Sequence, residues 1–470
     1  MADTISIMQF LKEQLYNMSC VVRFAPSPTG FMHVGNARIA IINYLFARKN
    51  EGQFIFRIDD TDVLRSKKEY EDAIKNDMNW LGITKIDRFF RQSERMARYE
   101  EIKNILISKG LLYKCYESPE ELEFKRKMAL SKGKAPVYDR ESLKLSSDDM
   151  KKLEDSGIKP YWRFKLPDET IVWNDMIMGE ISYDLKNVSD PVVVKADGTY
   201  LYTFSSVIDD FDSGITHIIR GQDHTTNTAV QIAIFNAISN HQFNVNFAHL
   251  SLLVNKDGSQ FSKRLGSLNL GDLREKGIEG MAINSLLATL GSSLDTIPLT
   301  NIEDLIDYFD ISKFSTNSPK FDIDELYTIS RKIVHKYSYD QVKSRIRNGD
   351  VLRRDVFDLV HENVEKIDDF YDWINVLSDE WDGALSMSED DKIFIKNVIN
   401  FVECEDILFD KEGLSKFLEI LKTKFNKNGK SLYMPIRNAI SGMEHGPNII
   451  DMIIVLGRDE FIRRLKNSIR

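Results

Sequence analysis

The sequence has few cysteines, no long apolar run and no leader-like start, and each absence excludes a class of protein. The cysteines among its 470 residues are Cys20, Cys115 and Cys404. They lie too far apart for a disulfide framework, which favours a reducing, cytoplasmic compartment. The apolar run 449–456 contains Asp451 and falls short of the ~18 residues that span a bilayer, so we expect no membrane segment. The first residues lack the basic segment that opens a secretory signal.

Acidic residues outnumber basic ones over most of the chain, but not at its end. The net charge is −9, whereas residues 411–470 hold 12 Lys and Arg against 6 Asp and Glu. A basic end on an acidic body fits a protein that touches a polyanion at a restricted surface. Charge alone favours the other explanation, an ordinary solvated helical surface, so the decision rests on the motifs.

The segment 21–58 has the pattern of a β-α-β unit. Residues 21–25 form a short apolar strand, and the Pro-Ser-Pro-Thr-Gly that follows excludes helix, because proline fixes φ and removes an N–H donor. Residues 36–49 then run apolar without a breaker, as in a buried helix, and 53–58 is a second strand. The unit predicts a parallel α/β sheet whose ligand lies at the carboxyl ends of the strands.

The remaining chain leaves room for two to four domains in all, at about 100–200 residues each. Residues 1–20 have the pattern of a short helical extension, and 69–112 alternate helical stretches. The lysine-rich segment 116–160 is typical of a surface insertion. Strands are expected at 161–166, 171–174, 191–195, 200–208 and 215–220, followed by a helix near 227–239. From about residue 300 the pattern is helical.

Two polar segments have the composition of a phosphate site. His33 comes just before the first turn of the expected helix, whose free N–H groups attract an anion, and Gly35 allows close approach. In 257–264, Lys263 puts a flexible cation beside the hydroxyl of Ser262, which suits phosphate charge in a transition state. Taken singly, each segment has an ordinary explanation, a turn or an exposed basic loop.

Together and in order, the motifs resemble class I aminoacyl-tRNA synthetases. His33-Val-Gly-Asn36 is similar to the His-Ile-Gly-His signature of that class, and Gln260-Phe-Ser-Lys-Arg264 to its Lys-Met-Ser-Lys-Ser signature. Further segments resemble the bacterial glutamyl-tRNA synthetases in particular: 23–30, 57–62, 220–224, 429–437 and 446–447. The matches extend from residue 21 to about 460, nearly the whole chain.

The resemblance implies a role for each matching position. The ATP contacts would be His33, Gly35, His224, Ser262 and Lys263, with His33 and Lys263 catalytic. The glutamate contacts would be Arg23, Ala25, Ser27, Asp59, Tyr202, Ser206 and Arg220. Arg23 and Arg220 would hold the side-chain carboxylate, because a guanidinium offers permanently charged, bidentate donors. Asp59 would receive the α-ammonium.

The implied reaction has two steps. The α-carboxylate of L-glutamate attacks the α-phosphorus of ATP and releases pyrophosphate, with Mg²⁺ on the phosphates. A ribose hydroxyl of the terminal tRNA adenosine then attacks the mixed anhydride. The resemblance implies tRNA-Glu as acceptor and leaves tRNA-Gln open. Asp59 and Gln260 depart from the more usual Glu and Lys, which fits a second, specialised synthetase.

The implied fold class is α/β: a Rossmann-like class I catalytic domain with an α+β insertion, a stem-contact region and an all-α C-terminal anticodon-binding domain. The divisions expected are an N-terminal extension (1–20), the first half of the catalytic domain (21–112), an insertion that binds the tRNA acceptor (113–199), the second half (200–240), the stem-contact region with the signature loop (241–330) and the helical anticodon-binding domain (331–470). Five basic residues of the tail are expected to contact phosphates: Lys430, Arg437, Arg463, Arg464 and Lys466.

No zinc is expected. Some relatives hold Zn²⁺ in the insertion through several cysteines, but here only Cys115 lies nearby, and one thiolate does not build a closed tetrahedral site. The expected partners are tRNA, L-glutamate and ATP, and the family implies a monomer. Two rival functions stay open: a small-molecule nucleotidyltransferase with the same His-x-Gly element, and a paralogue that binds tRNA without charging it.

Overall fold

The structure is a computed structural model that describes residues 20–242, 244–259, 269–347, 351–378, 381, 383 and 387–470. The chain divides into two compact units, Met1–Lys276 with Gly280–Asp324, and Gly277–Glu279 with Glu325–Arg470. The expected helical extension and the second signature loop lie outside the described residues.

A parallel sheet forms the centre of the first unit. Strand β1 (Val21–Phe24) pairs with β2 (Gln53–Ile58), and β2 with β3 (Arg88–Arg91), all in parallel. Helix α2 (Val34–Lys49) crosses from β1 to β2, which confirms the predicted β-α-β unit. A second sheet has the order β7 (Gly179–Asp184), β6 (Thr170–Asp175), β10 (Asn246–Leu250), β9 (His217–Gly221). Hydrogen bonds between Val21 and Thr216 join the two sheets.

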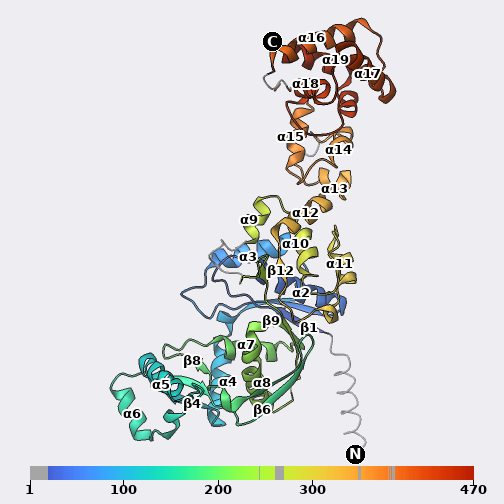
Figure 1. The fold of residues 1–470 in the computed structure, drawn as a ribbon. Coiled ribbons are helices and arrows are strands. Elements are labelled where there is room, and N and C mark those ends of the chain that lie inside the picture. Colours follow the sequence, from blue (N-terminus) through green and yellow to red (C-terminus); the bar gives the residue numbers. More distant parts are fainter. Residues whose placement is uncertain are drawn as a thin grey trace, which may run out of the picture. The chain divides into compact units, whose positions relative to one another are not determined.

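Helices cover both faces of these strands (Figure 1). Helices α2, α10 (Gly280–Leu287) and α11 (Ile302–Tyr308) pack together on one side. Helices α4 (Met96–Ser108), α7 (Tyr202–Asp212) and α8 (Thr225–Ser239) pack together on the other. The smaller elements of this unit are α3 (Lys68–Trp80), β11 (Val254–Asn255), α9 (Leu270–Glu275) and β12 (Lys320–Phe321).

The strand predicted at 200–208 is wrong, because residues 202–208 belong to α7. Phe204, Val207 and Ile208 are buried at the i, i+3, i+4 spacing of a helix. A short apolar run fits a buried strand equally well when its surroundings are unknown, which explains the error. The correction places Tyr202 and Ser206 on a helix.

The segment predicted as an insertion contributes to two sheets. Strands β4 (Leu112–Cys115), β5 (Tyr161–Phe164) and β8 (Val192–Val194) form a separate sheet, accompanied by α5 (Pro119–Ser131) and α6 (Ser147–Asp155). In contrast, β6 lies parallel to β10, with Asp175 opposite Phe247. The segment 113–199 is therefore continuous with the second sheet through β6.

Helices make up the described part of the second unit. They are α12 (Ile323–Val334, which begins in the first unit), α13 (Tyr339–Lys343), α14 (Arg354–Val360), α15 (Asp369–Val376), α16 (Glu389–Cys404), α17 (Lys411–Phe425), α18 (Lys430–Ser441) and α19 (Ile449–Ser468). The expected phosphate contact of Arg464 is wrong. Its side chain is buried and donates to the carbonyl oxygens of Val376, Ile440 and Ser378. Among the described residues, no helix is long and apolar enough to cross a bilayer.

Candidate active site

Three predicted arginine and aspartate positions lie at the carboxyl ends of neighbouring parallel strands. Arg23 lies on β1, Asp59 directly follows β2, and Arg220 lies near the end of β9. All three are at most 5% exposed. Carboxyl ends of parallel strands meet at one edge of a sheet, which is where α/β folds place their ligands. The sequence therefore folds these distant residues into one region.

Arg57 is the centre of a buried charge cluster beside this edge. Its Nε donates to Asp59 Oδ1 at 2.6 Å and its Nη1 to Asp210 Oδ1 at 2.7 Å. Arg23 Nε lies 3.2 Å from the other oxygen of Asp210. Burial raises the pKa of Asp59 to about 6, although Arg57 acts in the opposite direction. Asp210 lies on helix α7, beyond the segment 200–208 that was predicted as a strand, and the sequence pattern did not reveal this partner.

Arg220 is buried without a carboxylate partner among the described residues. Its Nη1 donates to Tyr202 Oη at 3.3 Å, its Nη2 to Thr228 Oγ1 at 2.6 Å, and its Nε to His249 Nε2 at 3.4 Å. Burial lowers the pKa of this guanidinium. A guanidinium has five N–H donors, so two remain, one on each Nη. A buried cation with two free donors is suited to an incoming carboxylate.

His33 caps helix α2, and this changes the expected phosphate site. Its Nδ1 accepts from the backbone N–H of Gly35 at 3.1 Å and of Asn36 at 3.4 Å. The expectation that these two N–H groups are free for an anion is therefore wrong. Because Nδ1 accepts, the proton of the neutral ring is on Nε2. A Cβ at position 35 would lie 3.0 Å from His33 Cε1, so a larger residue there would have to displace the capping imidazole.

The structure brings some of the other predicted residues together. The rings of Tyr202 and His224 lie 5.6 Å apart, and burial followed by the charge of Arg220 lowers the pKa of His224. Ala25 is half-buried and Ser27 exposed, in the loop where Pro26 accepts from the Asp59 N–H. Ser206 is buried, with its Oγ 3.0 Å from Gln231 Nε2. Ser262 and Lys263 lie outside the described residues, so their roles remain predictions.

Cys115, the one thiol near a zinc position of some relatives, is buried with its Sγ 3.6 Å from Tyr138 Oη. Burial raises the pKa of this thiol. In the part of the chain that the structure describes, no group of three His, Cys, Asp or Glu side chains is arranged to hold a metal ion. The expectation that the chain needs no zinc remains a prediction.

Sequence reasoning assigned no role to several residues that hold the site together: Arg57, Asp175, Asp210, Thr228 and His249. The adjacent Asp209 and Asp210 were the best available signal, since they interrupt an apolar stretch. Carboxylates buried in such a stretch need cationic or hydrogen-bonding partners. The pattern does not say which distant residues provide them.

Two family models cover the chain. The class I tRNA synthetase (E and Q) catalytic domain matches residues 19–328, and an anticodon binding domain matches 330–469. The chain therefore belongs to the class I tRNA synthetases for glutamate and glutamine.

Relatives that match nearly the whole chain show which family within this class it belongs to. A glutamate–tRNA ligase of Bartonella tribocorum is 42% identical over 460 residues, covering 95% of this chain and 99% of that protein. One of Rickettsia bellii is 42% identical over 448 residues, covering 95% and 99%. A crystal structure of a glutamate tRNA ligase from Elizabethkingia meningosepticum, in complex with its amino acid, has a TM-score of 0.80 at 26% identity, covering 96% and 99%. Within the class, the chain belongs to the family of glutamate–tRNA ligases.

Proposed function

We propose that this chain activates L-glutamate with ATP and Mg²⁺ and transfers it to the 3′ terminal adenosine of tRNA-Glu, with tRNA-Gln as the alternative acceptor. The observation that carries this proposal is Arg220, a buried guanidinium with two N–H donors left and no carboxylate partner among the described residues. The side-chain carboxylate of glutamate would supply the negative charge that pairs with the Arg220 guanidinium. Family membership supports the same substrate.

The remaining site residues would act around this anchor. Asp59 would receive the α-ammonium and share its charge with Arg57. The Nε2–H of His33 would donate to ATP phosphate, and Lys263 would neutralise charge that develops on phosphorus. Together these contacts would hold the glutamate α-carboxylate in line with the α-phosphorus of ATP. Such positioning of the two reactants accounts for much of the rate acceleration in reactions of this kind.

We extend the proposal to the division of the chain. Residues 21–112 and 200–240 would form the catalytic domain, 113–199 the acceptor-binding insertion, 241–330 the stem-contact region and 331–470 the anticodon reader, acting as a monomer in the cytoplasm. The match of 330–469 to an anticodon binding domain supports the last assignment.

Pyrophosphate exchange and tRNA charging test the function. Exchange that requires glutamate, ATP and tRNA, together with charging of purified tRNA, supports a ligase. Exchange at full rate without tRNA favours the nucleotidyltransferase, and tight tRNA binding without exchange favours a non-catalytic paralogue. Charging tRNA-Glu and tRNA-Gln side by side decides the acceptor.

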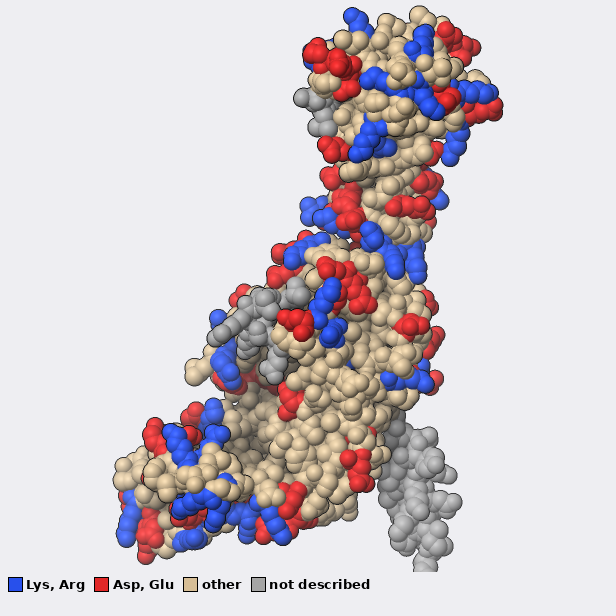
Figure 2. All heavy atoms as spheres, in the orientation of Figure 1, with Lys and Arg blue, Asp and Glu red and all other residues tan. Residues whose placement is uncertain are grey.

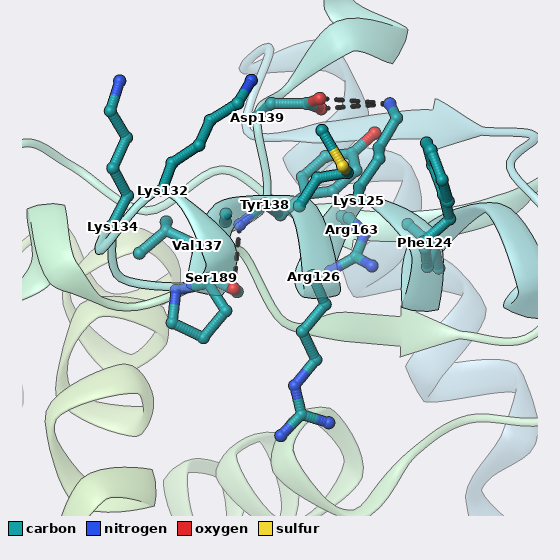
Figure 3. A pocket seen from close by; sticks show the side chains of 14 residues that line it. Phe124, Lys125, Arg126, Lys132, Lys134, Val137, Tyr138, Asp139, Arg163 and Ser189 are labelled. Carbon is teal, nitrogen blue, oxygen red and sulfur yellow. Dashed lines mark hydrogen bonds and ion pairs between the residues drawn. The ribbon is translucent and has the colours of Figure 1, made fainter.

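A basic groove in the insertion supports a contact with tRNA. It has a volume of about 480 Å³ and is lined by apolar residues of α5 and the following loop, including Phe124 and Val137 (Figure 3). Its basic lining residues are Lys125, Arg126, Lys132, Lys134 and Arg163. Asp139 pairs with Lys125, whereas Lys132 and Lys134 extend outward (Figure 3). Basic side chains gather on this lobe, with acidic ones between them (Figure 2).

Replacing Lys132 and Lys134 together with glutamine is expected to raise the KM for tRNA and leave the KM for ATP unchanged. The dependence of log K for tRNA on log salt concentration should become shallower by about one for each lost phosphate contact. The matched control is the same double change at Lys151 and Lys159, which are exposed and lie outside the groove. Equal effects in both variants would assign the change to net charge rather than to the groove.

A further inference from the structure

A buried Asp-His pair lies directly behind Arg220. The ring of His249 is fully buried on β10, and its Nδ1 is 2.5 Å from Asp175 Oδ2 at the end of β6. Its Nε2 is 2.9 Å from Thr228 Oγ1 and 3.4 Å from Arg220 Nε. Thr228 Oγ1 in turn accepts from Arg220 Nη2 at 2.6 Å. His249 Nε2 and Thr228 Oγ1 therefore accept from two of the three guanidinium nitrogens of Arg220, Nε and Nη2.

Asp175 determines which nitrogen of His249 carries the proton. Its Oδ1 accepts three backbone N–H groups, from Ile177, Met178 and His249, at 3.0–3.1 Å. Only Oδ2 is left to face Nδ1, and an ionised carboxylate oxygen can only accept. Nδ1 is therefore protonated and Nε2 has a lone pair, which is the form that accepts the Arg220 Nε–H. In the opposite tautomer, the Nε2–H could donate to Thr228 Oγ1, but the Arg220 Nε–H would face an N–H group instead of an acceptor.

We propose that Asp175 and His249 are positioning residues for glutamate recognition: Asp175 fixes the Nδ1–H tautomer of His249, and His249 with Thr228 orients Arg220 so that its remaining N–H groups face the substrate carboxylate. This inference rests on the proposed function. The pair also links two parts of the chain, because Asp175 is on a strand of the segment 113–199, whereas His249 and Arg220 are on β10 and β9.

Asp175→Asn tests the tautomer directly. The amide oxygen must occupy the place of Oδ1, where three N–H groups converge, so the amide NH₂ faces His249 Nδ1. The ring proton then moves to Nε2, opposite Arg220. We expect the KM for glutamate to rise about tenfold or more, the loss expected for one hydrogen bond to a charged group. The KM for ATP should change by less than about twofold, because Arg220 is proposed to contact glutamate and not ATP.

Nitrogen-15 spectra of histidine-labelled protein give a readout that a purely structural role would not move. The chain has eight histidines, so the His249 ring can be assigned by comparison with a His249→Gln variant. The wild-type ring should show protonated Nδ1 and the Asp175→Asn ring protonated Nε2. Asp190→Asn is the matched control, because Asp190 is equally buried in the same segment and binds Tyr113 and Arg140.

A pair of His249 variants keeps the proposal testable if Asp175→Asn does not fold. His249→Phe preserves a ring without an acceptor and should raise the KM for glutamate in the same way. His249→Gln can place an amide oxygen near Nε2 and should recover part of the loss. An unchanged glutamate KM in a folded Asp175→Asn or His249→Phe enzyme, or an equal rise for ATP, would overturn the proposal. A wild-type chain that charges no tRNA would instead refute the proposed function.

Discussion

Replacing Arg220 with alanine is expected to weaken glutamate binding by about 2–5 kcal/mol, because the substrate carboxylate would then be buried without its cation. The wild-type guanidinium is already desolvated and held by Tyr202, Thr228 and His249, so little ordering remains to be done when glutamate arrives. The effect should appear in the KM for glutamate or in direct titration with glutamate, while the KM for ATP stays near its wild-type value.

Two further variants serve as controls for the Arg220→Ala measurement. Arg220→Lys keeps a positive charge but loses the fork of donors, so its glutamate affinity should lie between those of the wild type and the alanine variant. Arg88→Ala removes an exposed arginine at the start of β3 and should leave glutamate binding unchanged. Near-normal glutamate affinity in a folded Arg220→Ala enzyme would show that this guanidinium is not the anchor, and the proposed pocket would fall with it.

The sequence was sufficient to predict the strands at 21–25 and 53–58 and the helix between them. Their apolar periods are unambiguous, and proline separates the first strand from the helix. The resemblance to a known family singled out Arg23, Asp59 and Arg220, and the rule that strand ends of a parallel sheet converge predicted that they lie at one edge. Their roles toward a substrate remain predictions. The structural predictions depend on local pattern and on one general rule of topology.

What the sequence did not reveal depends on contacts between distant residues. An exposed histidine before a helix can bind an anion or cap the helix, and only the backbone around His33 shows that its Nδ1 caps Gly35 and Asn36. Arg464 belongs to a basic tail, yet three carbonyl oxygens at helix ends bind its guanidinium. Residue type gives the chemistry in both cases, and packing decides whether a ligand or the protein itself uses it.

Replacing Arg57 with methionine is expected to destabilise the first unit by about 3–5 kcal/mol, the usual cost of removing one partner from a buried ion pair. Arg57 is 1% exposed and is bonded to both Asp59 and Asp210, so the variant leaves two buried carboxylates short of a cation. Methionine conserves the length of the apolar stem, which keeps a cavity from dominating the result. Hydrogen exchange of the β1 and β2 amides measures unfolding of this unit separately from the second one.

The pH dependence distinguishes lost charge pairing from lost packing. Burial already raises the pKa of Asp59 to about 6, and removing Arg57 takes away a group that opposes this rise. A carboxyl with a raised pKa binds more protons folded than unfolded. The stability of the variant should therefore be partly regained as the pH falls below the folded pKa of Asp59, which lies above 6 without Arg57, toward its ordinary value of 3.8. A loss of stability that is constant with pH would indicate lost packing instead.

Arg65→Met is the control variant. Arg65 forms an exposed ion pair with Asp62, so its replacement should lower the free energy of unfolding by less than about 1 kcal/mol. A stability loss of that size in Arg57→Met would mean that Arg23 and solvent suffice to hold Asp59 and Asp210, and that Arg57 is free to serve the substrate.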